Sequence, residues 1–143
     1  MKSAEKILSI DYGKKRWGLA FCDELRVVFA LSALTQAAFN ERFAGLKAIV
    51  KERQISRLVL GLPITLEGNK SELTLEVERF AKDILMPLGL PITLIDEALS
   101  SYEAENSIPK QKIKKGFQKR DGTVDSKAAA LILEDYLAQN PNS

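Results

Sequence analysis

The sequence predicts an α/β fold in which a mixed sheet of five strands carries helices on both faces. Three observations support this prediction. The first third of the chain holds three short apolar blocks separated by polar breaks, which is typical of an antiparallel meander. The segment RLVLGLP is apolar without polar alternation, as in a strand that is covered on both faces. Helical spacing of apolar residues recurs between the later strands, so we expect helical crossovers there.

The expected strands are joined by turns in the first third of the chain and by helices afterwards. They cover residues 7–11, 17–22, 27–31, 57–63 and 92–101. Gly61 and Pro63 are expected to close the fourth strand, and two acids, Asp96 and Glu97, end the fifth. Right-handed crossovers place the ends of strands one, four and five at one edge of the sheet, where function is expected in such folds.

The expected helices each show an apolar face. They cover residues 39–53, 72–85 and 125–137, with a further helical turn at 103–108. Ser71 is a suitable N-cap for the second helix, and the segment ITLEGNKS before it has the composition of a loop. Because no repeat or long linker interrupts this order, we expect one domain over residues 1–138 and a frayed tail over residues 139–143.

The composition is that of an ordinary globular protein, with 45% hydrophobic and 28% charged residues in a chain of 143. The N-terminal segment has no signal-peptide core, and no segment approaches the roughly 18 continuous apolar residues of a membrane span. We therefore expect a cytoplasmic protein without membrane contact. The net charge of +2 says little about partners by itself.

The residue types that are missing exclude several kinds of chemistry. The sequence has no histidine, which excludes mechanisms with an imidazole base or an imidazole metal ligand. Its one cysteine, Cys22, rules out disulfide frameworks and cysteine zinc sites, and its apolar surroundings (LAFC) indicate a core residue. Any metal must therefore be held by oxygen ligands, which favours Mg²⁺ or Mn²⁺ over zinc.

Carboxylates from distant parts of the chain fall at predicted strand ends or at a helix start. Asp11 ends the first strand, Asp96 and Glu97 end the fifth, and Asp125 begins the last helix. Adjacent strand residues point to opposite faces, so at most one of Asp96 and Glu97 shares a face with Asp11. Simpler interpretations exist: Asp11 as a cap of the turn YGKK, the Asp96–Glu97 pair as an exposed strand end, and Asp125 as an N-cap.

In combination these acids favour a metal site. Clustered carboxylates repel one another, and a divalent cation removes that repulsion. Two such ions about 3.5–4 Å apart can activate a water and stabilise the leaving oxygen of a phosphodiester, and this chemistry needs no histidine. We therefore expect a metal-dependent phosphodiesterase site at one edge of the sheet.

Basic residues concentrate between Lys110 and Arg120, where six of eleven residues are Lys or Arg and none is acidic. Such a run is either a solvated face or a mobile arm that contacts phosphates with an affinity that falls as salt rises. In the second case we expect substrate contacts at Lys112, Lys114, Lys115 and Lys119.

Four segments in this order, IDYGKKRWGLAFCD, LVLGLPITLEGN, LIDEALSS and VDSKAAALILEDYL, resemble the YqgF family, which is also called RuvX. The resemblance extends from Lys6 to Leu137. Members carry the names "putative pre-16S rRNA nuclease" and "putative Holliday junction resolvase". The family has an RNase H-like fold, which agrees with the order of strands and helices predicted above.

The resemblance implies which residues carry the chemistry. Asp11, Glu97 and Asp125 would be the catalytic acids that bind Mg²⁺ or Mn²⁺. One departure is Ala98, which stands where the family usually has an arginine. A phosphate contact by that arginine is therefore not implied for this chain, whereas the three acids are all present.

The resemblance also implies that the loop from Pro63 to Asn69 and the basic residues Lys14, Lys15 and Arg16 lie near the substrate. Gly13, just before them, has no side chain, so the backbone can turn sharply and a phosphate backbone can approach.

The resemblance implies that this phosphodiesterase is a metal-dependent endonuclease in the maturation of the 5′ end of precursor 16S ribosomal RNA. One alternative is resolution of four-way DNA junctions, which would demand a two-fold dimer, and another is a non-catalytic RNA-binding assembly factor. An ATPase of the actin-like superfamily shares the DxG-type first strand, but the chain is too short for its two subdomains. We expect a nucleic-acid partner, precursor rRNA before branched DNA, and a monomer or weak homodimer.

Overall fold

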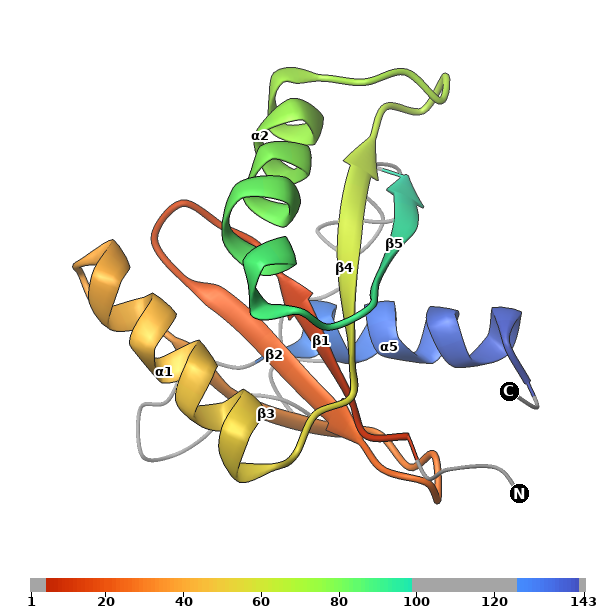
Figure 1. The fold of residues 1–143 in the computed structure, drawn as a ribbon. Helices are drawn as coiled ribbons and strands as arrows, with labels where there is room; N and C mark the ends of the chain where they lie inside the picture. Colours follow the sequence, from red (N-terminus) through yellow and green to blue (C-terminus); the bar gives the residue numbers. More distant parts are fainter. Residues whose placement is uncertain (1–4, 99–125, 142–143) are drawn as a thin grey trace, which may run out of the picture.

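Five strands form one mixed sheet with the order β3-β2-β1-β4-β5 (Figure 1). The computed structural model describes residues 5–98 and 126–141. Its strands are β1 (Ile7–Asp11), β2 (Trp17–Cys22), β3 (Phe29–Leu34), β4 (Arg57–Ile64) and β5 (Ile92–Ala98). The first three pair antiparallel, whereas β4 runs parallel to β1 and β5 runs parallel to β4. The predicted mixed sheet with three antiparallel strands first is confirmed.

Helices cover both faces of this sheet. The helical segments are α1 (Phe39–Glu52), α2 (Glu72–Phe80), a π-helical turn (Ala81–Leu85), a 3₁₀ turn (Met86–Leu88) and α5 (Lys127–Gln139). Helices α1 and α2 lie on one face, and α5 crosses the other (Figure 1). In the part of the chain that the structure describes, none of these helices is long and apolar enough to cross a membrane.

The sheet separates two apolar cores, and strand alternation assigns each residue to one of them. Leu8 and Ile10 belong to the core under α1 and α2, whereas Ile7 belongs to the core under α5. Because successive strand residues point to opposite faces, Ser9 and Asp11 share the α5 face with Ile7. Cys22 is fully buried in the α5 core, as its apolar surroundings predicted.

Several element boundaries differ from those predicted. β3 begins at Phe29 instead of residue 27, and α5 begins at Lys127 instead of residue 125. β4 does not close at Pro63 but continues to Ile64. Its pairing with β1 ends at Leu60, and beyond that point β4 pairs with β5 alone, so a proline is tolerated on the side that has become an edge. The turn expected at residues 103–108 lies outside the described residues.

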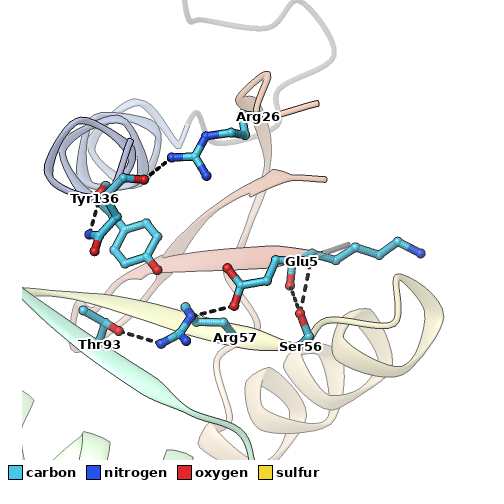
Figure 2. Close-up of polar contacts among 8 residues, drawn as sticks. Glu5, Arg26, Ser56, Arg57, Thr93 and Tyr136 are labelled. Atoms are coloured by element: carbon cyan, nitrogen blue, oxygen red, sulfur yellow. Dashed lines mark hydrogen bonds and ion pairs between the residues drawn. The ribbon is translucent and has the colours of Figure 1, made fainter. Parts of the chain in front are cut away.

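Polar contacts fasten the end of the sheet where the parallel strands begin. Arg57, at the start of β4, donates to Glu5 Oε2 and to Thr93 Oγ1, each at 3.0 Å (Figure 2). Arg26, in the turn between β2 and β3, reaches the C-terminal end of α5 near Tyr136 (Figure 2), where it donates to the Asn140 carbonyl and, at 3.3 Å, to the Leu137 carbonyl. These contacts hold this end of the sheet together, and the opposite end, where β1, β4 and β5 finish, carries Asp11, Asp96 and Glu97.

Candidate active site

Asp11 ends β1 on the α5 face, beside the beginning of α5. Its partner on β2 is Gly18. A Cβ built on Gly18 would lie 3.5 Å from Asp11 Cβ and 3.6 Å from Ser126 Oγ. Asp11 and Ser126 therefore both flank the side-chain-free position 18, and the first strand and the start of the last helix lie close together there although 115 positions separate these two residues (126 − 11).

Two serines fix the first turn of α5 to the sheet. Ser126 occupies the N-cap position and is only 2% exposed. Its Oγ accepts a hydrogen bond at 2.9 Å from the Leu19 N–H, beside the point where the register between β2 and β3 shifts. Ser9 Oγ donates to the Ala129 carbonyl at 2.7 Å. The N-cap is thus Ser126 and not Asp125, which lies outside the described residues.

The acids of β5 point to opposite faces, and Glu97 takes the face of Asp11. Ile95 belongs to the core under α5, so Glu97, two residues further along the strand, shares that face. One carboxylate oxygen of Glu97, Oε2, is fully buried. Asp96 points to the other face and is exposed. The role of Glu97 as a metal ligand stays a prediction, but its placement is the one that this role needs.

Gly61 lies on the strand between the two acids. It pairs with Ile95 on β5, and the β1–β4 register places it level with Asp11. Two strand spacings of about 4.8 Å each separate β1 from β5, and Glu97 lies two residues beyond Ile95, so the two acids are also offset along the strands. A Cβ on Gly61 would lie 2.5 Å from Ile132 Cδ1 and 3.6 Å from Glu97 Cγ. Because Gly61 has no side chain, nothing projects from β4 between the two acids at this position, and α5 can pack closely on β4.

The donor set at this end of the sheet contains oxygen ligands alone, which fits Mg²⁺ or Mn²⁺. Asp11 and Glu97, two of the three acids predicted to bind metal, lie on the same face and at the same end of the sheet, with β4 between their strands. Within residues 5–98 and 126–141, no group of three Asp, Glu, Cys or His side chains could hold a metal ion. The third predicted ligand, Asp125, immediately precedes the anchored Ser126 in the sequence but is outside these ranges.

The basic turn that follows β1 exposes Lys14, Lys15 and Arg16. A Cβ on Gly13 would lie 2.7 Å from the Arg16 carbonyl oxygen, so this tight turn requires glycine. Lys14 Nζ lies 3.8 Å from Glu76 Oε1 of α2. The turn therefore presents cations at the same end of the sheet as Asp11.

Tyr12 connects the end of β1 to α2. Its hydroxyl donates to Glu76 Oε2 at 2.6 Å, and its ring packs on Phe80 with 4.6 Å between ring centroids. Burial, followed by the contact with Glu76, raises the pKa of the Tyr12 hydroxyl to about 12. Because the phenol stays protonated, it holds α2 against the strand end that carries Asp11.

The loop after β4 is closed by its own hydrogen bonds. The Thr65 N–H donates to the Asn69 carbonyl and the Asn69 N–H donates to Thr65 Oγ1, each at 2.9 Å. Gly68 has a φ of 84°, which favours glycine. A contact of this loop with substrate remains a prediction, as do contacts by the lysines that lie outside the described residues, Lys112, Lys114, Lys115 and Lys119.

Sequence reasoning did not identify the small residues that shape this site. Gly18 and Gly61 lie under the acids, and Ser9 and Ser126 anchor α5 beside them. A signal was present, because a glycine inside an apolar strand often marks the close approach of another element. The runs WGLAFC and LVLGLP both carry one.

Comparison with known proteins gives consistent matches over most of the chain. The RuvX family model, described as Holliday junction resolvase, matches residues 5–139. A Synechococcus elongatus protein named "Putative pre-16S rRNA nuclease" is 41% identical over 132 residues, or 91% of this chain and 87% of that protein. One of the same name from Acaryochloris marina is 38% identical over 135 residues, or 94% and 92% of the two chains. The Thermus thermophilus RuvC structure, 11% identical with a TM-score of 0.50, covers 95% of this chain and 96% of its own, a likeness of fold alone.

Proposed function

Because this chain belongs to the RuvX family and is a nuclease, we propose that it is a metal-dependent endonuclease acting on the 5′ end of precursor 16S ribosomal RNA. The observation that carries the proposal is the placement of Asp11 and Glu97 on one face of the sheet, at the end where β1, β4 and β5 finish. Asp125 would complete the set as the third acid.

Asp11, Glu97 and Asp125 would hold Mg²⁺ or Mn²⁺, since carboxylate oxygens are the ligands that these ions prefer. When bound, the metal supplies activation of a water and stabilisation of the leaving oxygen. The chain's own part is to hold the acids in place. Ser126 and Ser9 fix α5 to the sheet, and the glycines at positions 18 and 61 let α5 pack closely on the strands beside the acids.

Basic residues beside the acids would bind the phosphate backbone. We assign this role to Lys15 and Arg16 of the turn after β1, with Gly13 allowing close approach, and to Lys112, Lys114, Lys115 and Lys119 of the basic segment. Lys14 lies in the same turn, but its ammonium is 3.8 Å from the Glu76 carboxylate. Contacts with phosphates release counterions, so binding would weaken as the salt concentration rises. The reaction would take place in the cytoplasm.

The names of the relatives support ribosomal RNA as the substrate, and the family description supports four-way DNA junctions as the second candidate. Symmetric cleavage of a junction needs two active sites related by a two-fold axis. If the protein remains a monomer when a junction is bound, this result would therefore favour ribosomal RNA as the substrate.

The test is cleavage of precursor 16S rRNA and of a synthetic four-way junction, side by side, with Mg²⁺, with Mn²⁺ and with EDTA. We expect metal-dependent cleavage at the 5′ side of the rRNA and little cleavage of the junction. Asp11→Asn should abolish cleavage and preserve the fold, because it removes charge at constant shape. The matched control is Asp83→Asn, an exposed acid in the turn after α2.

Each alternative has its own result. Preferential cleavage of the junction would show that four-way DNA junctions, and not ribosomal RNA, are the substrate. Full activity of Asp11→Asn would contradict the metal site. Binding of rRNA without cleavage in any metal would favour an assembly factor.

A further inference from the structure

Arg42 of α1 is a buried cation whose partners are backbone carbonyls. It is 6% exposed, so nearly all of its guanidinium is out of water. Nη1 donates to the Gln36 and Ala37 carbonyls at 2.7 and 3.3 Å, and Nη2 donates to the Lys14 carbonyl at 3.1 Å. Among the residues that the structure describes, no carboxylate forms an ion pair with it. A charge is costly to bury without a counter-charge, so the hydrogen bonds to these carbonyls must compensate the buried guanidinium.

The geometry of Arg42 joins the basic turn to the rest of the domain. Its guanidinium lies over the Trp17 ring at 5.2 Å from the ring centroid. One side chain therefore holds the turn at the Lys14 carbonyl and at Trp17, the first residue of β2. Gly13 constrains the same turn from within, because a Cβ there would lie 2.7 Å from the Arg16 carbonyl oxygen. The backbone of the turn is thus held in one shape before any ligand arrives.

The held turn divides its three cations into two kinds. Lys14 Nζ lies 3.8 Å from the Glu76 carboxylate, which offsets its charge. Lys15 and Arg16 are exposed and form no ion pair with any other described residue. Two cations on a rigid turn can meet phosphates with little further loss of conformational entropy.

We propose that Arg42 is a positioning residue for nucleic-acid binding, which holds the Gly13–Arg16 turn so that Lys15 and Arg16, and not Lys14, contact phosphates. This inference rests on the proposed function, in which the turn binds the substrate backbone. Arg42 is too buried to contact a phosphate itself. Lysine cannot replace it, since one ammonium lacks the planar fork that reaches Gln36, Ala37 and Lys14 together.

The test measures binding of the full-length protein to a fluorescein-labelled single-stranded RNA in EDTA, by anisotropy at several salt concentrations. The slope of log K against log salt is negative. Lys15→Gln and Arg16→Gln should each reduce its magnitude by about 0.7, the value for one phosphate contact on a single strand. Lys14→Gln should leave the slope nearly unchanged, and it is the matched control, since it removes the same charge from the same turn.

Arg42→Lys keeps the buried charge but loses the fork. We expect it to reduce the magnitude of the slope by about 1.4, which equals the loss of the Lys15 and Arg16 contacts together. Adding Lys15→Gln to Arg42→Lys should then change little, because the contact is already lost. If Arg42→Lys does not fold, Gly13→Ala distorts the turn from the other side and should give the same loss.

Three results would overturn the inference. They are a wild-type slope in Arg42→Lys, a wild-type slope in Gly13→Ala, or a loss in Lys14→Gln equal to that in Lys15→Gln. A purely structural role of Arg42 would lower the unfolding midpoint and leave the slope of the folded protein unchanged. If one of these three results is found and the wild-type protein still cleaves rRNA, only the proposed role of Arg42 fails. If it neither binds nor cleaves RNA, the proposed function fails as well.

Discussion

The packing of α5 against β4 at Gly61 yields a quantitative prediction for Gly61→Ala. The new Cβ would lie 2.5 Å from Ile132 Cδ1 and 3.0 Å from its Cγ1. Carbon atoms in contact are normally about 3.5–4.0 Å apart, so either the Ile132 side chain or α5 must move. Ile132 is 4% exposed and packed in the core under α5, which leaves it little room to rotate away.

The cost follows from two opposing terms. Overpacking a core typically costs about 1–3 kcal/mol. Replacing glycine by alanine restricts the unfolded chain and returns about 0.4–1 kcal/mol. We therefore expect Gly61→Ala to lower the free energy of unfolding by about 1–2 kcal/mol. Ile132→Val, which deletes the clashing Cδ1, should alone cost about 0.5–1.5 kcal/mol.

The double variant decides whether the clash is the cause. Because Ile132→Val removes Cδ1, the nearer of the two atoms that the new Cβ meets, Gly61→Ala with Ile132→Val should be no less stable than Gly61→Ala alone. The coupling energy from the four-protein cycle should then be about 1 kcal/mol, within the usual range for residues in contact. Urea unfolding of the four proteins, with the midpoint and the m-value compared, measures it. Additive effects within about 0.5 kcal/mol would refute this account of the glycine.

Three further predictions concern other parts of the structure. Glu97→Gln should abolish cleavage whereas Asp96→Asn, on the opposite face, should retain most of it; the reverse result would show that the site faces the other side. The Tyr12 hydroxyl has a pKa of about 12 in the folded protein against 10.0 as its ordinary value, so stability should fall as the pH rises from 10 to 12. Tyr12→Phe should remove this dependence in urea unfolding, and an equal loss in the variant would refute the assignment. Arg26→Gln should cost about 1–2 kcal/mol of unfolding free energy, because Arg26 donates to the Leu137 carbonyl and the last turn of α5 has no basic residue of its own; an unchanged urea midpoint would count against this role.

Local pattern was sufficient for the parts of the fold that depend on neighbouring residues. β1 and β2 lie at the residues predicted, because short apolar runs bounded by turn residues specify a strand without reference to distant segments. Asp11 at the end of β1 and the oxygen-only donor set also follow from the sequence directly. The fold class followed from the order of these elements and the crossover rules.

The tertiary structure decided which side chains share the site. Sequence alone allowed either Asp96 or Glu97 to face Asp11, and the choice came from the core that Ile95 joins. Residues that act between elements carry little local signal. Ser126 binds the Leu19 N–H across 107 positions, and Arg42 reaches the Lys14 carbonyl across 28. A serine or an arginine looks the same in the sequence whether it is solvated or buried, because its burial depends on which distant backbone groups the packing of α1 and α5 brings within hydrogen-bond reach.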